Sequence, residues 1–299
     1  MGLPHRPLEL RAEDVELVMD NNAGILSVVG TPIGNLEDVS GRVIDTLGRA
    51  DAILCEDTRV TSRLLAHFGI QVPLVRADEN VIESRVASAL ERVGRGERVA
   101  FVSDAGMPCV SDPGQRLVDA ALDAGLPVEV IPGPSSVTCA VAASGLHAER
   151  FFFEGFLPRK RGPKERRLEL LSTVPGSLVI LESPRRVADT VASIARVMPT
   201  RRVALVRELT KVHEECVRDV ATSLAKRLEG AEAKGECVLV VEMPTDVELQ
   251  RRMAPVATLE EAIGEALRTS EPKSAIAKRL AKEYGLSKSE VYDRMLELG

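Results

Sequence analysis

The stretch that carries the most chemistry-bearing residue types is SDAGMP at residues 103–108. It follows the apolar run at 99–102, which we expect to be a buried strand. Such a strand places the carboxylate of Asp104 and the flexible Gly106 at the carboxyl edge of a sheet, where open α/β sheets bind small ligands. The backbone amides and hydroxyls of this loop could hold an adenosine-like ligand.

Two further strand-like runs end in loops of the same kind. Residues 25–29 lead into GTPIGN at 30–35, and residues 128–131 lead into PGPSS at 132–136. Three such loops indicate one ligand pocket built from loop backbone. The first loop is not GxGxxG, because Gly30 and Gly34 are four residues apart, so it does not support a dinucleotide fold. Taken alone, it could equally be a plain turn from strand to helix.

Charged residues end other predicted strands. EDTR at 56–59 follows a strand at 51–55, RELTK at 207–211 ends another strand, and KGE at 234–236 precedes the last strand of the core. Asp57 could deprotonate a hydroxyl and Arg59 could hold a phosphate. The alternative is a surface ion pair in which Asp57 only caps the next helix.

The composition is that of a soluble globular protein. The 299 residues are 44% hydrophobic and 28% charged, which is enough for two domains and a small third. A net charge of −6 excludes nonspecific coating of nucleic acid, so any such contact needs a local basic group. With 3% aromatic residues and no Trp, a surface that binds single strands mainly by stacking is excluded.

The cysteine pattern and the apolar runs bear on location. Five scattered cysteines without a CxxC pair are typical of a reduced, cytoplasmic protein. Residues 1–22 have no apolar core, so we expect no signal peptide, and no run is long enough to span a bilayer. His213 and Cys216 would face opposite sides of a strand, so we expect no metal site there.

Strand and helix patterns alternate over residues 24–145, which we expect to form an N-terminal α/β domain. Strands are predicted at 25–29, 51–55, 98–103 and 128–131, and helices at 38–49, 58–68, 79–95, 114–125 and 135–144. This alternation predicts a mostly parallel sheet with helices on both faces. Residues 1–23 precede it as an N-terminal extension that could be disordered.

The pattern changes after residue 145, and a second α/β domain is predicted at 146–243. Its strands are expected at 151–156, 177–181, 202–207, 214–220 and 236–242, partly antiparallel because several connections are short. Residues 158–167 are expected to be a basic loop. A linker at 244–257 and a small helical domain at 258–299 follow, the latter with a helix-turn-helix outline in which Gly285 and Ser287 suit the caps.

Eight motifs occur in order: GTPIGNLEDV, EDTR, SDAGMP with SDPG, IPGPSS, FEGFLP, LESPRR, RELTK and KGE. They resemble the signatures of the tetrapyrrole methylase fold family, and match best its ribosomal RNA small subunit methyltransferase I branch, the 16S rRNA ribose 2′-O-methyltransferases. The resemblance covers residues 24–243 densely. It implies two α/β domains with a ligand cleft between them, S-adenosylmethionine as the methyl donor in that cleft, and a homodimer.

By position, the resemblance implies donor contacts from Pro32, Gly34, Asp104, Ala105, Gly106, Ser135, Ser136, Glu208, Leu209 and Gly235. The implied activity is 2′-O-methylation of a cytidine ribose in 16S rRNA of the 30S subunit, in the cytoplasm, without a metal or a membrane. Three motifs depart from the branch: Met107 replaces its usual Thr, LESPRR replaces YESPHR, and RADEN at 76–80 replaces a His-Asn-Glu cluster.

The catalytic and RNA-binding roles follow from the reaction. A ribose hydroxyl is a poor nucleophile and benefits from a general base. Asp57 and Glu208 are the first candidates, with Glu236 next and Lys211 if burial depresses its pKa. RNA phosphates could be held by Arg59, Arg159, Lys160, Arg161 and Lys164, although the basic stretch could also be a solvated surface loop.

Two other functions remain open from the sequence. One is a methylase of a small tetrapyrrole; the basic stretch and the helical tail favour RNA. The other is a nucleic-acid-binding regulator, in which the tail reads DNA and the α/β core only senses a nucleotide-like ligand.

Overall fold

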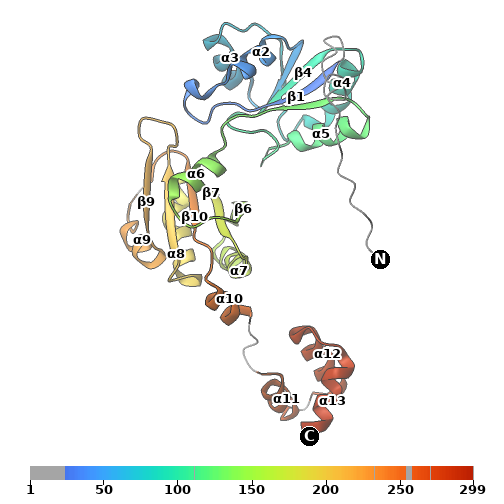
Figure 1. The fold of residues 1–299 in the computed structure, drawn as a ribbon, viewed down its shortest axis with the longest axis vertical. Coiled ribbons are helices and arrows are strands. Elements are labelled where there is room, and N and C mark those ends of the chain that lie inside the picture. The colour runs from blue at the N-terminus through green and yellow to red at the C-terminus, as the bar shows by residue number, and fades with distance from the viewer. Residues whose placement is uncertain (1–23, 111, 232, 254–257, 270, 299) are drawn as a thin grey trace.

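The computed structural model describes residues 24–110, 112–231, 233–253, 258–269 and 271–298. The N-terminal extension predicted at 1–23 lies outside these residues. Two five-stranded sheets, each covered by helices, follow one another along the chain, and three C-terminal helices lie apart from them (Figure 1). The predicted fold class, two α/β parts plus a C-terminal helical part, is confirmed.

The first sheet is entirely parallel, with strand order β3-β2-β4-β1-β5. Its strands are β1 (Ile25–Val29), β2 (Ala52–Cys55), β3 (Leu74–Arg76), β4 (Arg98–Val102) and β5 (Val128–Ile131). One face packs against α2 (Gly41–Gly48) and α3 (Thr58–His67), and the other against α4 (Ile82–Gly94) and α5 (Gly114–Asp123). Because helices cover both faces, every residue of β2 is buried and apolar.

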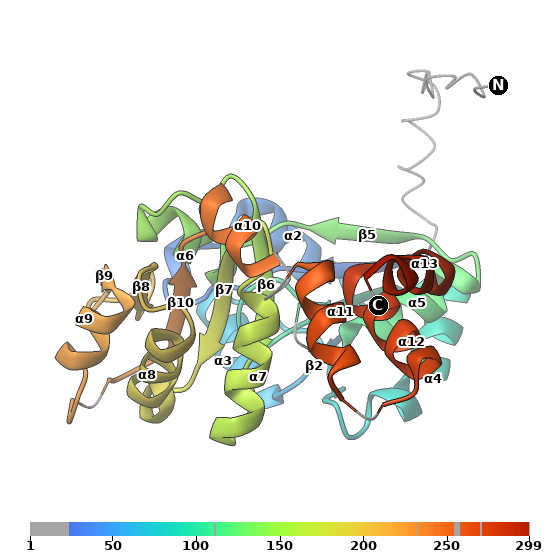
Figure 2. The ribbon, with the colours of Figure 1, turned by 90° about the horizontal axis from the view of Figure 1, so that it is seen from below.

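The second sheet is mixed, with strand order β6-β7-β10-β8-β9. Its strands are β6 (Phe151–Phe156), β7 (Ser177–Glu182), β8 (Arg202–Arg207), β9 (Glu215–Val220) and β10 (Cys237–Val241). β6 and β7 are parallel, and the other pairs are antiparallel. Over one face lie α7 (Arg161–Leu171), α8 (Val187–Val197) and α9 (Ala221–Arg227), as Figure 2 shows.

The other face of the second sheet is covered by α6 (Ser136–Ser144), which follows the last strand of the first sheet. Val137 and Ala140 of this helix share a buried cluster with Val206 and Val238 of the second sheet. The chain therefore crosses between the sheets before α6, whereas the predicted boundary lies after this helix at residue 145. Sequence order could not reveal this, because the helix itself has the same pattern on either sheet.

Two stretches expected to be irregular contain helices. Most of the predicted basic loop is α7, where Leu168 and Leu171 are buried against the second sheet and Pro163 stands in the first turn, the helical position that tolerates proline. Helix α10 (Asp246–Met253) occupies part of the predicted linker at 244–257. Residues 254–257 lie outside the described residues.

The C-terminal helices are α11 (Leu259–Leu267), α12 (Lys273–Tyr284) and α13 (Lys288–Leu298). They share a small core of their own, which includes Ile263, Leu280 and Met295. As the sequence predicts, Gly285 ends α12 in the left-handed conformation, with φ of +67°. None of the helices in the described ranges is both long and apolar enough to cross a membrane.

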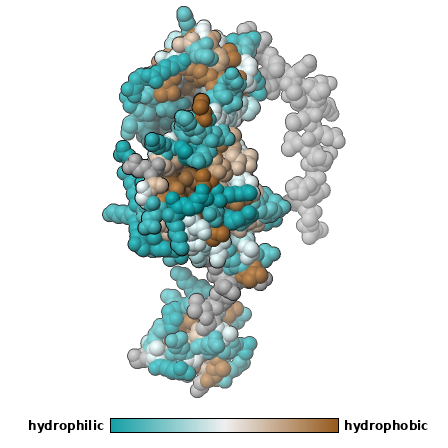
Figure 3. All heavy atoms as spheres, turned by 90° about the vertical axis from the view of Figure 1, so that its left-hand side faces the viewer, coloured by the Kyte–Doolittle hydropathy of each residue, from teal (hydrophilic) through white to brown (hydrophobic). Residues whose placement is uncertain are grey.

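The loop after β1 joins the two sheets. Thr31, at its start, is fastened to the first sheet through the backbone of Gly106. Two residues later, Ile33 is only 6% exposed and belongs to the buried cluster between α6 and the second sheet. On the face shown in Figure 3, apolar side chains reach the surface on either side of the hollow between the two sheets. Ile33 therefore holds the carboxyl edge of the first sheet against the second.

The substitution Ile33→Ala tests this contact. It removes three buried carbons and leaves a void that the surrounding strands cannot fill, so we expect the free energy of unfolding in urea to fall by about 2–4 kcal/mol. The matched control is Leu36→Ala in the helical turn Leu36–Asp38, because Leu36 is 40% exposed and should lose less than about 1 kcal/mol. Equal losses in the two variants would contradict the role given to Ile33.

Candidate active site

The loops that end β1, β4 and β5 are fastened to one another by backbone contacts. The Thr31 amide donates to the Gly106 carbonyl (2.9 Å), and the Gly106 amide donates back to the Thr31 carbonyl (3.1 Å). A Cβ on Gly30 would lie 2.6 Å from the Gly133 amide nitrogen, so only glycine fits this crossing. The Gly133 amide donates to Met107 Sδ (3.1 Å), so Met107, one of the departures from the family pattern, helps to hold the crossing.

The loops after β2 and β4 are also joined. The Asp104 amide donates to Glu56 Oε1 (3.2 Å), and the Asp57 amide donates to Asp104 Oδ1 (3.0 Å). The Asp57 carboxylate caps α3 through the Arg59 amide (2.8 Å) and pairs with the Arg59 guanidinium (2.6 Å). These hydrogen bonds hold the pKa of Asp57 well below its usual range. A carboxylate with its oxygens so engaged is a weak proton acceptor.

The second sheet contributes a strained loop between β8 and β9. Glu208 and Thr210 both adopt left-handed backbone angles, with φ of +52° and +65°, which non-glycine residues seldom do outside functional sites. Glu208 Oε1 accepts from Lys211 Nζ (3.0 Å) and from the Glu236 amide (3.0 Å). Lys211 Nζ also lies 3.3 Å from Glu236 Oε2.

Within this loop, Glu208 and Lys211 stay charged as a carboxylate and an ammonium. The hydrogen bond from Lys211 lowers the pKa of Glu208. Burial alone would lower the pKa of Lys211, but the hydrogen bond with Glu208 and the charge of Glu236 outweigh burial and raise the pKa. The condition on which Lys211 was predicted to act as a base, a depressed pKa, is therefore not met.

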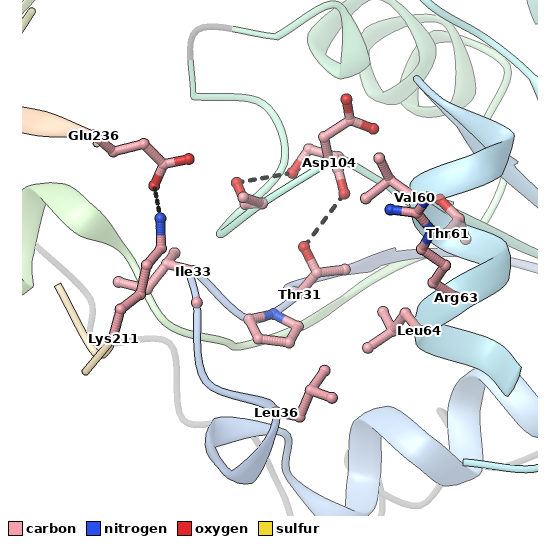
Figure 4. A pocket seen from close by; sticks show the side chains of 14 residues that line it. Thr31, Ile33, Leu36, Val60, Thr61, Arg63, Leu64, Asp104, Lys211 and Glu236 are labelled. Carbon is pink, nitrogen blue, oxygen red and sulfur yellow. Dashed lines mark hydrogen bonds and ion pairs between the residues drawn. The ribbon is translucent and has the colours of Figure 1, made fainter. Parts of the chain in front are cut away.

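A cavity of about 330 Å³ opens between the first sheet and this loop. The loop after β1, including Pro32 and Gly34, forms its floor, and Lys211 and Glu236 lie opposite α3 (Figure 4). The α3 side chains that line it were missed by the sequence analysis: Val60, Thr61, Arg63 and Leu64. The last three follow Val60 by one, three and four residues, a spacing that places all four on one face of a helix. The sequence therefore contained a signal from which these lining residues could have been predicted.

A second cavity of about 360 Å³ shares Ile33, Ala105 and Glu236 with the first and extends toward the second sheet. Its other lining residues are Ser136, Phe156, Leu181, Glu182, Ser183, Pro184, Gly235, Cys237 and Val238. Burial raises the pKa of the Cys237 thiol to about 11, so this thiol stays protonated and is no nucleophile at neutral pH. Phe156 and the 181–184 stretch belong to motifs noticed in the sequence, but their place at a cavity was not predicted.

The structure brings most of the predicted donor-binding residues to these two cavities. The residues that line one or both are Pro32, Gly34, Asp104, Ala105, Ser136 and Gly235. Four others stand in the same loops but line neither cavity: Gly106, Ser135, Glu208 and Leu209. Leu209 is instead buried in the cluster that contains Ile33.

The predicted phosphate-binding residues divide into three groups. Arg159, Lys160 and Arg161 are exposed at the start of α7. Lys164 is fully buried, with Nζ held by Asp189 Oδ2 (2.6 Å) and Thr190 Oγ1 (2.9 Å), so its charge does not reach the surface. The Arg59 side chain is exposed but already paired with Asp57. In the described part of the chain, no group of three or more His, Cys, Asp or Glu residues could hold a metal ion.

Comparison with known proteins decides the family. The sequence profile of the Tetrapyrrole (Corrin/Porphyrin) Methylases matches residues 26–225. The chain belongs to the tetrapyrrole methylase family. Its fold agrees with this family membership, as the crystal structure of a diphthine synthase, 18% identical, superposes with a TM-score of 0.59 over 74% of this chain and 90% of the other.

Curated relatives place the chain within this family. Ribosomal RNA small subunit methyltransferase I of Halalkalibacterium halodurans is 39% identical over 91% of this chain and 95% of the relative. The protein of the same name from Thermotoga maritima is 41% identical over 73% of this chain and 98% of its own length. This tetrapyrrole methylase family member is therefore similar along most of its length to proteins named for rRNA methylation.

The substitution Gly235→Ala tests the coupling of Glu208 and Lys211. A Cβ at Gly235 would collide with the Glu208 carboxylate, so the pair should break and the lowered pKa of Glu208 should rise toward its ordinary value of 4.5. Carboxyl carbon NMR titration measures this shift directly.

The matched control is Gly230→Ala. Gly230 has a similar positive φ, +72° against +79° for Gly235, but a Cβ there meets nothing within 4 Å. It should carry the same backbone strain and leave the pKa of Glu208 lowered. A titration of Glu208 that is unchanged in Gly235→Ala would contradict this account of the pair.

Proposed function

We propose that this protein transfers a methyl group from S-adenosylmethionine to the 2′-hydroxyl of a cytidine ribose in 16S rRNA of the small ribosomal subunit. The observation that carries the proposal is the pair of cavities that share Ile33, Ala105 and Glu236. Two ligands held there would meet at one wall, as a methyl donor and its acceptor must. The names of the curated relatives supply the class of substrate.

The residues of the second cavity fit the donor. Its lining combines the apolar residues Leu181, Pro184 and Val238 with the hydroxyl-bearing residues Ser136 and Ser183, a mixture suited to an adenosine. When bound, S-adenosylmethionine supplies an electrophilic methyl group on a sulfonium, and Ala105, Ser136 and Gly235 are the predicted contacts that would hold it here.

The first cavity suits the nucleotide that is methylated. Arg63 gives it a cationic side chain for phosphate, and Thr31 and Thr61 are hydroxyl-bearing residues of its wall.

Glu236 is the proposed general base. It lines both cavities, so its carboxylate lies where the hydroxyl and the donor would meet, and it would accept the proton of the ribose hydroxyl. Lys211 stays protonated and holds Glu236 in place through Nζ. The Glu208 carboxylate accepts a hydrogen bond from the Glu236 amide and so holds the backbone of Glu236, and the Asp57 side chain caps the start of α3. We therefore assign to Glu236 the role of general base for which Asp57 and Glu208 were the first candidates.

RNA would lie across the start of α7. Arg159, Lys160 and Arg161 are exposed there, three to five residues beyond Phe156 of the second cavity. From the family resemblance we also propose that the protein is a cytoplasmic homodimer. The predicted domain boundaries at 145, 243 and 257 likewise remain proposals.

A methyl-transfer assay tests the function. Purified protein with labelled S-adenosylmethionine and undermethylated 30S subunits should add one methyl group to a cytidine ribose of 16S rRNA, located by mass mapping of nuclease fragments. Uroporphyrinogen III serves as the comparison substrate. A methyl group on a nucleobase or on the tetrapyrrole would contradict the proposal.

The general base is tested in the same assay. Glu236→Gln should lower kcat by about a hundredfold or more, because a general base accelerates such a reaction by at least this factor. Asp57→Asn, whose carboxylate is engaged by Arg59, should change kcat only a few-fold.

Charge reversal tests the RNA surface. Loss of two phosphate contacts in the double variant Arg159→Glu/Lys160→Glu should weaken RNA binding and reduce the slope of log K against log salt by roughly 1.4, at about 0.7 per contact on a single strand. Filter binding over a salt series measures both. Lys226→Glu is the control, because Lys226 is exposed on α9, the helix that follows the opposite edge strand of the second sheet. An unchanged slope in the double variant would mean that this stretch is only a solvated surface.

A further inference from the structure

Phe156 has an unusual position for an aromatic residue of this chain. The sequence contains six Phe, two Tyr and no Trp. Of the aromatic residues in the described ranges, only Phe156 lines either cavity of the site. It is 60% exposed, more than Phe151 or Phe152 of the same strand. A phenyl ring that is exposed and also forms part of a cavity wall is accessible to a ligand in that cavity.

The surroundings of Phe156 suit a planar heteroaromatic ring. The second cavity combines apolar walls from Leu181, Pro184 and Val238 with the polar side chains of Ser183 and Glu182. A nucleobase has two apolar faces and a polar edge, so it can bury a face on a phenyl ring while its edge meets polar groups. Aliphatic ligands would gain nothing particular from an aromatic wall.

The chain immediately after Phe156 is held by Arg186. Arg186 Nη2 donates to the carbonyl of Leu157 (2.8 Å), and its Nε lies 3.2 Å from Glu182 Oε1. Glu182 Oε1 also accepts from the Ser183 amide (2.9 Å), so one guanidinium ties the end of β6, which carries Phe156, to the end of the neighbouring strand β7.

A buried network fixes Glu182 from behind. Glu182 Oε2 accepts from Thr190 Oγ1 (2.7 Å), which in turn accepts from the buried Lys164 Nζ (2.9 Å). Lys164 also pairs with Asp189, so two cations and two anions balance one another here. Lys164, Thr190 and Glu182 are buried, and a buried, fully hydrogen-bonded network of this kind holds the Glu182 carboxylate in one position at the cavity wall. This gives Lys164 a role in the site, although it does not reach RNA.

We propose that Phe156 is the stacking platform for a nucleobase in the second cavity, and that Arg186 and Glu182 are its positioning pair. The inference rests on the proposed function, because that function supplies two nucleobases, the adenine of the methyl donor and the base of the target nucleotide. Either nucleobase has a planar aromatic face that could stack on Phe156. The experiment below distinguishes the adenine from the target base.

The test compares Phe156→Leu, which keeps an apolar side chain of similar size, with Phe156→Tyr, which keeps the aromatic face. Calorimetry with S-adenosylhomocysteine gives the donor-side Kd, and the methylation assay gives KM for 30S subunits. Phe156→Leu should weaken one of these by roughly tenfold, and Phe156→Tyr by no more than about twofold. A raised Kd assigns the platform to adenine, and a raised KM with unchanged Kd assigns it to the target base.

The positioning pair is tested by Arg186→Gln, with the exposed neighbour in Arg185→Gln as the matched control. Arg186→Gln should raise the same constant that Phe156→Leu raises, and the double variant should be no worse than Phe156→Leu alone, because both changes remove one function. Additive losses would show that Arg186 acts independently of the ring.

A failure of the stacking proposal can be distinguished from a failure of the proposed function. If the wild-type protein neither binds S-adenosylhomocysteine nor methylates rRNA, the proposed function fails. If it does both, and Phe156→Leu is folded and equal to wild type in Kd and KM, the stacking platform is overturned. If Kd and KM are unchanged but sedimentation shows that Phe156→Leu alters the mass of the particle in solution, Phe156 belongs to a contact between copies of this chain. That result also overturns the stacking platform.

Discussion

The site depends on the burial of one aliphatic side chain, Ile33, between the two sheets. Its loop is bonded to the first sheet through Thr31 and Gly106, while the side chain lies in the cluster that covers the second sheet. The next residue, Gly34, passes beneath Lys211 so closely that a Cβ would lie 2.6 Å from Lys211 Cγ. Because Ile33 lines both cavities, their common wall exists only while this contact holds the two sheets together.

Around this contact, the site is built mainly from backbone rather than from large side chains. The loops after β1 and β5 cross at Gly30 and Gly133 at distances that exclude any Cβ, and the loop after β8 places Glu208 and Thr210 in the left-handed region. Such geometry is unfavourable locally and persists because the two sheets determine it from both sides. This geometry leaves a narrow space between the loops, in which backbone amides and carbonyls can lie close to a ligand.

The charged residues of the site mostly fix one another. Asp57 is engaged by Arg59, Glu208 by Lys211 and the Glu236 amide, and Glu182 by Thr190 and Arg186. A carboxylate already paired with a cation is held in its ionised form, which suits a structural anion and not a group that must take up a proton. Glu236 also lies near a cation, with Oε2 3.3 Å from Lys211 Nζ, but its side chain is 71% exposed and lines both cavities, so its carboxylate is the one that can meet a ligand.

The amino-acid sequence by itself determined most strands and helices of both sheets, although not β3 or α7, because these elements depend on the period of apolar residues and on Gly and Pro at strand ends. The family was indicated by the order and residues of the eight motifs. The sequence did not reveal that α6 packs on the second sheet, that Lys164 is buried, or that Lys211 keeps its proton. Each of these depends on which residues distant in sequence come together. Spacing along the chain says that a lysine or a carboxylate is present, and only the tertiary structure decides which partner surrounds it and therefore what it can do.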